Sequence, residues 1–278
     1  MKKRGKKITL FLIDGDANGR IMCELSNWSG KSYKIPRTYI KNSEDREDLS
    51  NTGVYILFGK DDAGNNMAYI GEAENIRQRL LQHLSTKDFW NETIVFISKD
   101  NNLNKAHIKY LEGRLYDIAR DADRYRLENS TKPTKSSISE PDQAEMEEFI
   151  DNLRLIVNTL GHKIFDSVIN YNNDNSDGVF LINRKGLIAK GKPTNEGFVV
   201  LKNSQISMTL GSVNTSIAIL REKYILEGFI KEDNGTFVTT KDLIFSSASL
   251  AATIVLGVSS NGQKEWKYNG KTLKELQQ

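Results

Sequence analysis

The stretch GVYILFGKDDAGNNMAYIGEAENIRQRLLQH, from Gly53 to His83, decides how this chain is interpreted. Its pattern predicts a strand (VYILF), a polar turn, a second strand (MAYIG) and a helix (ENIRQRLLQHL). A third strand (ETIVFIS), another polar turn and a longer helix (KAHIKYLEGRLYDIARDA) follow. Together these elements predict a compact α/β unit of the α+β class, built on a small three-stranded sheet with flanking helices.

The helix of this stretch carries two side chains that could reach a cleft. Ile76, Leu80 and Leu84 recur at helical spacing and define a buried stripe. Arg79 and His83 lie one step around from that stripe, at the edge of the expected core. The alternative is that Arg79 is an ordinary solvated helix residue.

The longer helix carries a carboxylate on its apolar row. Ile108, Leu115 and Ala119 form that row, and Glu112 falls between them. A carboxylate on a buried face is costly unless a cation, a hydrogen bond or a metal compensates it. Glu112 is therefore a candidate ligand; the alternative is a flanking position that reaches water or pairs with Arg79.

These residues resemble the motifs of the GIY-YIG nuclease domain. Its two short motifs are present as Gly53-Val54-Tyr55 and Tyr69-Ile70-Gly71. The further positions that match the family's arginine, histidine, metal-binding glutamate and late asparagine are Arg79, His83, Glu112 and Asn129. Two motifs, one helix with Arg79 and His83, and the later Glu112 and Asn129 make five elements in the right order within residues 53–129; this makes the resemblance specific, whereas a lone Tyr-Ile-Gly would be weak.

The resemblance implies an endonuclease that hydrolyses phosphodiester bonds with one divalent metal, magnesium or manganese, bound by Glu112 and water. A hard oxygen ligand suits such a metal. Arg79 offers donors to the extra charge of the transition state. Tyr55 is the expected base or water-positioning group, and it needs a cation or an acceptor for its proton. Tyr69 and His83 are expected helpers; the alternative for both tyrosines is a structural role in the sheet.

Two positions depart from the family pattern. Val54 replaces an isoleucine in the first motif, and Glu72 stands where a small hydroxyl residue is frequent. Neither change removes a catalytic group, but Glu72 could repel phosphate near that turn.

Composition shifts divide the rest of the chain. We expect a strand-rich N-terminal segment over 1–52, the nuclease-like domain over 53–130, a linker with an acidic helix over 131–177, and a C-terminal α+β domain over 178–278. The end of the chain resembles an uncharacterised C-terminal domain that accompanies GIY-YIG domains in some bacterial proteins.

The C-terminal segment contains a candidate nucleic-acid surface. KEWKYNGKTL predicts a hairpin with an Asn-Gly turn, which would place Trp266 beside Lys264, Lys267 and Lys271. An aromatic ring and lysines can stack on bases and neutralise phosphates. A second Asn-Gly hairpin in FIKEDNGTFVTT follows a helix, as in winged-helix DNA readers, although this analogy is associational. A packed tryptophan and structural hairpins are the alternatives.

Charge and composition limit the classes of partner. The chain has 278 residues and a net charge of +3, concentrated at its two ends: residues 1–50 carry +4 and residues 178–278 carry +5. Basic flanks suit a polyanion, although ordinary solvated surfaces explain them equally well. The single cysteine, Cys23, fits a reducing compartment, and no apolar run approaches the ~20 residues of a membrane span. We expect a cytoplasmic protein without membrane contact.

The sequence therefore predicts a metal-dependent endonuclease that acts on nucleic acid, with DNA favoured over RNA, and it leaves a homodimer open. One rival is a catalytically silent nucleic-acid-binding or regulatory protein derived from a nuclease. Another is an interaction protein whose acidic helix near 142–160 docks a partner.

Overall fold

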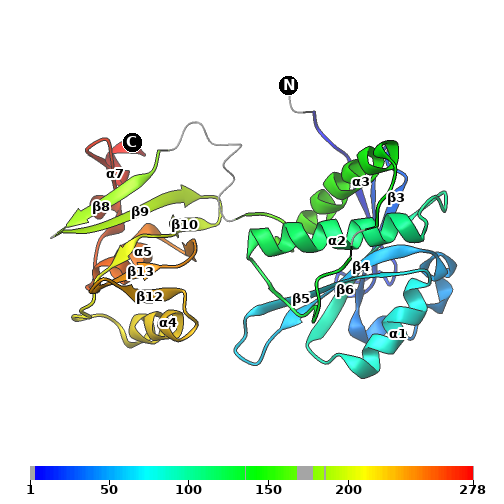
Figure 1. Ribbon diagram of the computed structural model, residues 1–278, viewed down its shortest axis with the longest axis horizontal. Coiled ribbons are helices and arrows are strands. Elements are labelled where there is room, and N and C mark those ends of the chain that lie inside the picture. The colour runs from blue at the N-terminus through cyan, green and yellow to red at the C-terminus, as the bar shows by residue number, and fades with distance from the viewer. Residues whose placement is uncertain (1–3, 135, 168–177, 185, 278) are drawn as a thin grey trace. The chain divides into compact units, whose positions relative to one another are not determined.

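The computed structural model describes residues 4–134, 136–167, 178–184 and 186–277. The chain divides between residues 167 and 168 into two compact units, whereas composition suggests three boundaries, after residues 52, 130 and 177. Both units are mixed α+β, so the expected fold class holds at that level (Figure 1). The last part of the expected linker, residues 168–177, lies outside the described residues.

Unit 1 is built on a seven-stranded sheet, not on the three-stranded sheet expected. Its strand order is β1-β2-β3-β6-β4-β5-β7. All neighbours are antiparallel except β5 and β7. The elements of unit 1 are β1 (Ile8–Leu12), β2 (Ile21–Leu25), β3 (Gly30–Pro36), β4 (Gly53–Lys60), β5 (Asn66–Ala73), α1 (Ile76–Thr86), β6 (Trp90–Ser98), α2 (Lys105–Ala122), β7 (Arg126–Leu127) and α3 (Glu140–Thr159).

The N-terminal strands are continuous with the sheet that carries the Gly53–His83 stretch. β3 pairs with β6 from Gly30 opposite Ser98 to Pro36 opposite Glu92. The segment 1–52 is therefore part of the same sheet as residues 53–98. Three short 3-10 turns between Arg37 and Ser50 lead from β3 into β4.

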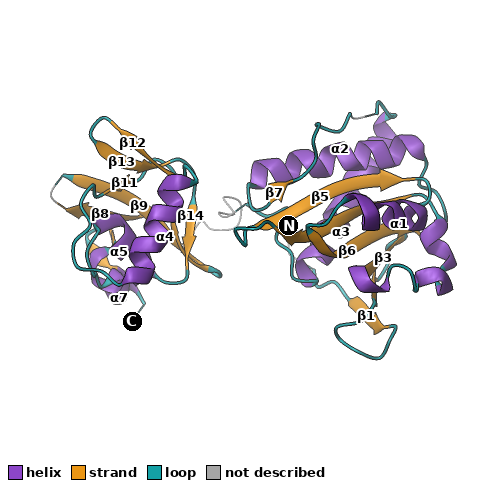
Figure 2. Ribbon diagram, turned by 90° about the horizontal axis from the view of Figure 1, so that it is seen from below, coloured by secondary structure: helices purple, strands orange, loops and turns teal. Residues whose placement is uncertain are grey.

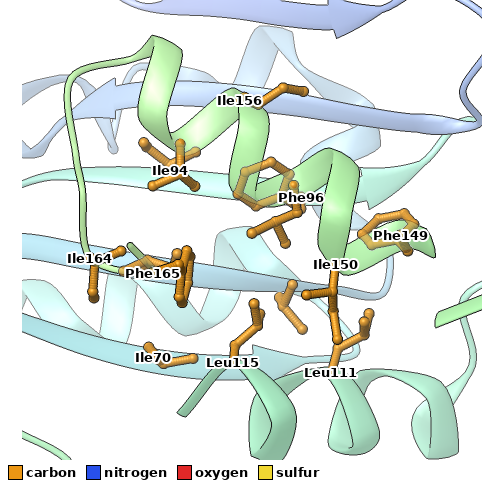
Figure 3. Close-up of a cluster of buried hydrophobic side chains, with 14 of the residues drawn as sticks. Ile70, Ile94, Phe96, Leu111, Leu115, Phe149, Ile150, Ile156, Ile164 and Phe165 are labelled. Carbon is orange, nitrogen blue, oxygen red and sulfur yellow. The ribbon is translucent and has the colours of Figure 1, made fainter. Parts of the chain in front are cut away.

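Strand alternation divides unit 1 into two cores, because successive side chains point to opposite faces. On one face, α2 and α3 pack over Ile56, Ile70, Ile94 and Phe96 (Figure 3). On the other face, α1 packs over Tyr55, Leu57, Val95 and Ile97. The two tyrosines of the sequence motifs thus belong to the α1 face.

Helix α3 completes the first of these cores. Met146, Phe149, Ile150 and Leu153 are buried in it, and Ser139 caps the helix by accepting from the Asp142 amide. The apolar face of the acidic helix is therefore already covered within unit 1, and a partner that docks on this helix, the rival interpretation, would have to contact its polar face.

Unit 2 contains two sheets. One has the order β14-β10-β9-β8-β15-β16, and the other has the order β11-β13-β12. Its elements are β8 (Phe180–Arg184), β9 (Leu187–Thr194), β10 (Gly197–Val200), β11 (Gln205–Ile206), α4 (Thr215–Leu226), β12 (Ile230–Asp233), β13 (Thr236–Thr239), β14 (Leu243–Phe245), α5 (Ala248–Leu256), α6 (Gly262–Glu265), β15 (Lys267–Tyr268), β16 (Lys271–Thr272) and α7 (Leu273–Leu276).

Both expected Asn-Gly hairpins are present in unit 2. β12 and β13 are joined through Asn234 and Gly235, and β15 and β16 through Asn269 and Gly270; all four turn residues have positive φ. This is the backbone geometry that a two-residue hairpin of this type requires. Within the described residues, every helix is too short or too polar to cross a bilayer.

Candidate active site

Three side chains of the sequence motifs meet on the α1 face of unit 1. In the pairing of β4 with β5, Tyr55 lies opposite Gly71, and Tyr69 lies opposite Leu57. The two tyrosine rings are 6.2 Å apart, and the His83 ring from α1 lies 5.5 Å from Tyr55 and 5.3 Å from Tyr69. Residues far apart in sequence thus form one polar and aromatic cluster.

The glycine of the second motif makes room for this cluster. A Cβ atom on Gly71 would lie 2.4 Å from the Tyr55 hydroxyl oxygen and 2.8 Å from the Tyr69 ring. Both distances are below any real Cβ contact, so a side chain here would displace both rings. Gly71 is therefore a packing requirement of the site.

Helix α1 fixes the position of His83. Asn75 caps the helix by accepting from the Gln78 amide, and Ile76 and Leu80 anchor it in the core. Arg37 binds its last turn by donating to the carbonyl oxygens of Leu84 and Lys87, at 2.9 and 2.6 Å. The helix is thus held at both ends.

His83 and Tyr55 are joined by a short hydrogen bond. The Tyr55 hydroxyl lies 2.7 Å from Nε2 of His83, and both side chains are buried. Burial, together with the charges of Lys87 and Arg79, lowers the pKa of His83 to about 4. Neutral His83 can therefore accept the hydrogen bond of the Tyr55 hydroxyl. Burial raises the pKa of the Tyr55 phenol well above its usual range, and the neighbouring Tyr69 raises it further.

Arg79 lies on the exposed side of the cluster. Its Nη1 donates to Oε1 of Gln82 at 3.2 Å. Its positive charge lowers the pKa values of Tyr55, Tyr69 and Glu112. One exposed guanidinium is therefore electrostatically coupled to each of these groups.

Glu112 comes from α2, which packs against β5 from the opposite face. The helix is anchored by the fully buried Ile108, Leu111 and Leu115, and the Glu112 carboxylate is half-buried. Among the described residues, no hydrogen bond or ion pair reaches that carboxylate. Burial and the charge of Glu72 raise its pKa to about 7, against the opposing charges of Lys105, Arg79 and Lys109.

This carboxylate fits a divalent cation held mainly by water. It has unused oxygen acceptors, which are the ligands that magnesium and manganese prefer. The described part of the chain contains no cluster of three or more histidine, cysteine or carboxylate side chains suited to a metal. A cation here would therefore rest on Glu112 and water, as the sequence predicts.

Asn129 lies at the edge of β5 instead of pointing into the cluster. Its Oδ1 accepts from the Ile70 amide at 3.1 Å, and its Nδ2 donates to the Ile70 carbonyl oxygen at 2.8 Å. The side-chain amide thus continues the strand ladder that β7 forms with Met67 and Ala68. In this structure Asn129 positions the central residue of the second motif.

Two ion pairs that sequence reasoning did not identify border the site. Lys87 pairs with Glu128 and its ammonium lies 4.3 Å from the centre of the Tyr69 ring. Lys105 binds Glu72 at 3.0 Å, which partly offsets the negative charge expected to repel phosphate. No sequence signal marks either pair, because each joins elements that meet only in the folded sheet.

The structure corrects the assignment of Trp266 in unit 2. Its ring is fully buried, lies 4.6 Å from the Phe198 ring, and donates from Nε1 to the Ala248 carbonyl oxygen at 3.0 Å. A buried indole cannot stack on a base, so the packed tryptophan is the correct alternative. Lys264, Lys267 and Lys271 are exposed on α6 and the β15–β16 hairpin.

The comparisons with known proteins concern mainly unit 2. Residues 180–277 match a family model described as a domain of unknown function (DUF4357), in agreement with the uncharacterised C-terminal domain expected from the sequence. The GIY-YIG resemblance of residues 53–129 has no family match behind it and stays a prediction. Comparison with curated proteins and with solved structures gives no match.

Proposed function

We propose that unit 1 hydrolyses phosphodiester bonds of nucleic acid, most readily DNA, with one divalent metal ion. One observation carries the proposal. Tyr55, Tyr69 and His83 meet in one cluster, and the charges of the exposed Arg79 and of the unpaired Glu112 act on both tyrosines, although four separate elements supply these residues. A simple structural cluster would have no need for a half-buried, unpaired carboxylate, which is costly.

Glu112 supplies the metal-binding oxygen in this proposal. Magnesium or manganese bound there would polarise a phosphoryl oxygen and ease departure of the leaving oxygen. To bind the metal ion, the carboxylate must be ionised and accessible. Since its pKa is raised to about 7, it gains a cation more readily as the pH rises through neutrality.

Tyr55 and His83 form the proton path of the proposal. The water that attacks phosphorus gives its proton to the Tyr55 oxygen, while the Tyr55 hydroxyl proton moves along the 2.7 Å hydrogen bond to Nε2 of His83. His83 is neutral near pH 7, so Nε2 is available for that proton, and the negative charge of a bound phosphate would raise the low pKa of His83 and favour the transfer. The phenol then stays uncharged throughout. This avoids a free phenolate, which burial disfavours.

Arg79 neutralises charge on the transferring phosphoryl group. Its guanidinium is exposed and carries donors suited to two phosphoryl oxygens. Because extra negative charge develops only in the transition state, this interaction would accelerate the reaction beyond what binding alone gives.

A specific observation favours the rival, a nucleic-acid-binding protein without cleavage. Tyr55 has no exposed surface, and the Tyr69 and His83 rings lie against it. If those rings do not move, water cannot reach the Tyr55 oxygen. The rival and the nuclease therefore differ in whether the cluster opens when substrate binds.

Cleavage assays on matched variants separate the two. Wild type, Glu112→Gln and Arg79→Ala are incubated with plasmid, single-stranded DNA and RNA, with magnesium, manganese or chelator. Arg77→Ala is the control on the same helix, since Arg77 pairs with Glu44 outside the cluster. Loss of one positioned charge-stabilising donor costs roughly 10²–10³ in rate.

The nuclease predicts metal-dependent cleavage by wild type and Arg77→Ala and none above background by Glu112→Gln, which should still bind. Binding that is unchanged across all four proteins, with no cleavage of any substrate, would support the rival instead. Absence of both binding and cleavage would overturn both.

A further inference from the structure

The first strand of the sheet has an uncovered apolar edge. β1 is terminal in the strand order and pairs only with β2 (Figure 2). Its last three residues are all apolar and all exposed: Leu10 by 48%, Phe11 by 51% and Leu12 by 40%. Edge strands that stay unpaired usually carry lysine, proline or a bulge, and Ile8–Leu12 has none of these.

The backbone of β1 presents free donors and acceptors along this edge. Lys7 O accepts from Ser26 N at 3.0 Å, and Ile13 N donates to Arg20 O at 2.9 Å. In an antiparallel pair such hydrogen-bonded residues alternate, so residues 7, 9, 11 and 13 face β2. The N–H and C=O groups of Ile8 and Leu10 and the N–H of Leu12 therefore point away from the sheet, while the Leu12 carbonyl oxygen already accepts from the Gly15 amide at 3.2 Å.

This edge is complementary to itself. Two copies of β1 placed antiparallel about a twofold axis at Leu10 would pair Leu10 with Leu10 and Ile8 with Leu12 of the second copy. The pairings use the outward backbone groups just described, with the Leu12 carbonyl oxygen accepting a second hydrogen bond through its other lone pair, and the apolar side chains meet on both faces. An interface in which the same patch serves both partners is the usual form of a twofold dimer.

The charges that flank β1 favour the antiparallel arrangement. The basic residues Arg4, Lys6 and Lys7 precede the strand, and the exposed Asp16 follows it, whereas the nearer Asp14 is paired with Arg20 of the same chain at 2.7 Å. Antiparallel pairing brings the basic start of one copy beside the acidic end of the other. A parallel arrangement would place like charges together, which is destabilising.

We propose that two copies of this chain associate through β1, joining their sheets edge to edge. This inference does not rest on the proposed function, because it concerns the opposite edge of the sheet from β5. The dimer would carry two copies of the Tyr55–Glu112 site on one continuous sheet. Strand pairing along one short edge gives a small interface, so the dimer should dissociate on dilution.

Sedimentation analysis of the full chain over a wide concentration range tests the proposal. Wild type should shift from monomer to dimer as concentration rises. Leu10→Pro removes an outward N–H without touching the pairing to β2, since proline is tolerated on the free side of an edge strand. It should weaken the dimer by roughly tenfold or more in dissociation constant. Leu226→Lys, which changes a leucine on α4 that is even more exposed (81%), should leave the dimer unchanged.

Charge reversal distinguishes this interface from other modes of association. Lys7→Glu and Asp16→Lys should each weaken the dimer, and the double variant should restore it, because the opposite charges then meet again. A chain that stays monomeric at every concentration overturns the proposal. So does a dimer that Leu10→Pro and the single charge reversals leave intact.

Discussion

Glu112 shows how a single residue can reveal a site. A half-buried carboxylate without a hydrogen-bonding partner destabilises the protein that carries it. Its pKa is raised from 4.5 to about 7, so the folded state holds the proton more tightly than the unfolded chain does. Below pH 4.5 both states are protonated and nothing is lost, whereas between pH 4.5 and 7 only the unfolded chain ionises and stability falls.

The first prediction is that Glu112→Gln stabilises the metal-free protein at pH 8. The free energy of unfolding should rise by about 1–2 kcal/mol at pH 8, after allowing for the exposed part of the side chain, and should not change at pH 4. Urea unfolding at both pH values in chelator measures it. Glu145→Gln, on an exposed carboxylate of α3, is the control and should show no such difference. Equal stability of Glu112→Gln and wild type at pH 8 would contradict the claim that the unpaired Glu112 carboxylate destabilises the fold.

The second prediction concerns the neighbour of that carboxylate. Glu72→Gln removes a negative charge that raises the pKa of Glu112 and leaves Lys105, which lowers it. Both effects lower the pKa of Glu112. The pH at which magnesium or manganese begins to bind should therefore fall by roughly 0.5–1 unit.

Calorimetric titration with manganese at a series of pH values tests this shift. Glu74→Gln is the matched control, because Glu74 also reaches Lys105, at 3.6 Å, but is not a cause of the Glu112 shift. A midpoint that moves equally in both variants, or not at all, would show that Glu72 does not tune the site.

The sequence identifies which residues belong to the cluster but not how exposed each of them is. Motif order and spacing are enough to select Tyr55, Tyr69 and His83, because they are local features of two strands and a helix. Burial of Tyr55 and of Trp266 depends on which elements cover them, and those elements lie far away in sequence. The same limit explains why the sequence, with lysines on both sides of Trp266, predicts a surface position for this buried residue.

At the scale of the elements, the hydrogen bonds at the edge of β5 determine how the second motif is positioned. β7 pairs with only two residues of β5, so the ladder would end before the second motif. The Asn129 amide extends it by bonding both backbone groups of Ile70. This holds β5 in the register that sets Gly71 opposite Tyr55.

The third prediction is that Asn129→Ala loosens this edge. Removing two side-chain hydrogen bonds to the backbone should destabilise unit 1 by about 1–2 kcal/mol. Hydrogen exchange at the Ile70 amide should also become faster, since the amide loses its acceptor. Asn66→Ala, an exposed asparagine on the same strand, is the control and should leave both quantities near wild type. Unchanged exchange at Ile70 in Asn129→Ala would argue against the strand-extending role.

The elements that local sequence patterns specify match the prediction, whereas the strand pairings that depend on distant partners do not. The strands and helices of residues 53–122 follow hydrophobic periodicity closely. The Asn-Gly turns and the Ser247 cap of α5 are equally local. The pairing of β3 with β6 joins residues about sixty positions apart, and no local pattern specifies it. A seven-stranded sheet therefore takes the place of the three-stranded sheet expected.

At the scale of the whole molecule, the candidate site and the excess of positive charge belong to different units. Unit 1 holds the candidate site, and residues 178–278 carry a net charge of +5. With Trp266 buried, base stacking is no longer part of the expected nucleic-acid contact. What is left of that surface is a set of exposed lysines, which would bind phosphates without regard to sequence.

The fourth prediction follows from that change. If Lys267 and Lys271 contact phosphates, replacing both with alanine should weaken DNA binding about equally for all sequences. The slope of log affinity against log salt concentration should become less negative by roughly 2. Fluorescence anisotropy with a labelled duplex at several salt concentrations measures it, and Glu112→Gln provides a background without cleavage.

Lys202→Ala is the matched control, since Lys202 is an exposed lysine elsewhere in unit 2. It should leave the slope near wild type. Trp266→Phe should also leave the slope unchanged, because the ring lies in the core beside Phe198. A loss of affinity in Trp266→Phe without a loss of stability would restore the stacking role that its burial excludes. An unchanged slope in the double lysine variant would remove this hairpin from the DNA-binding surface and leave unit 1 to bind its substrate alone.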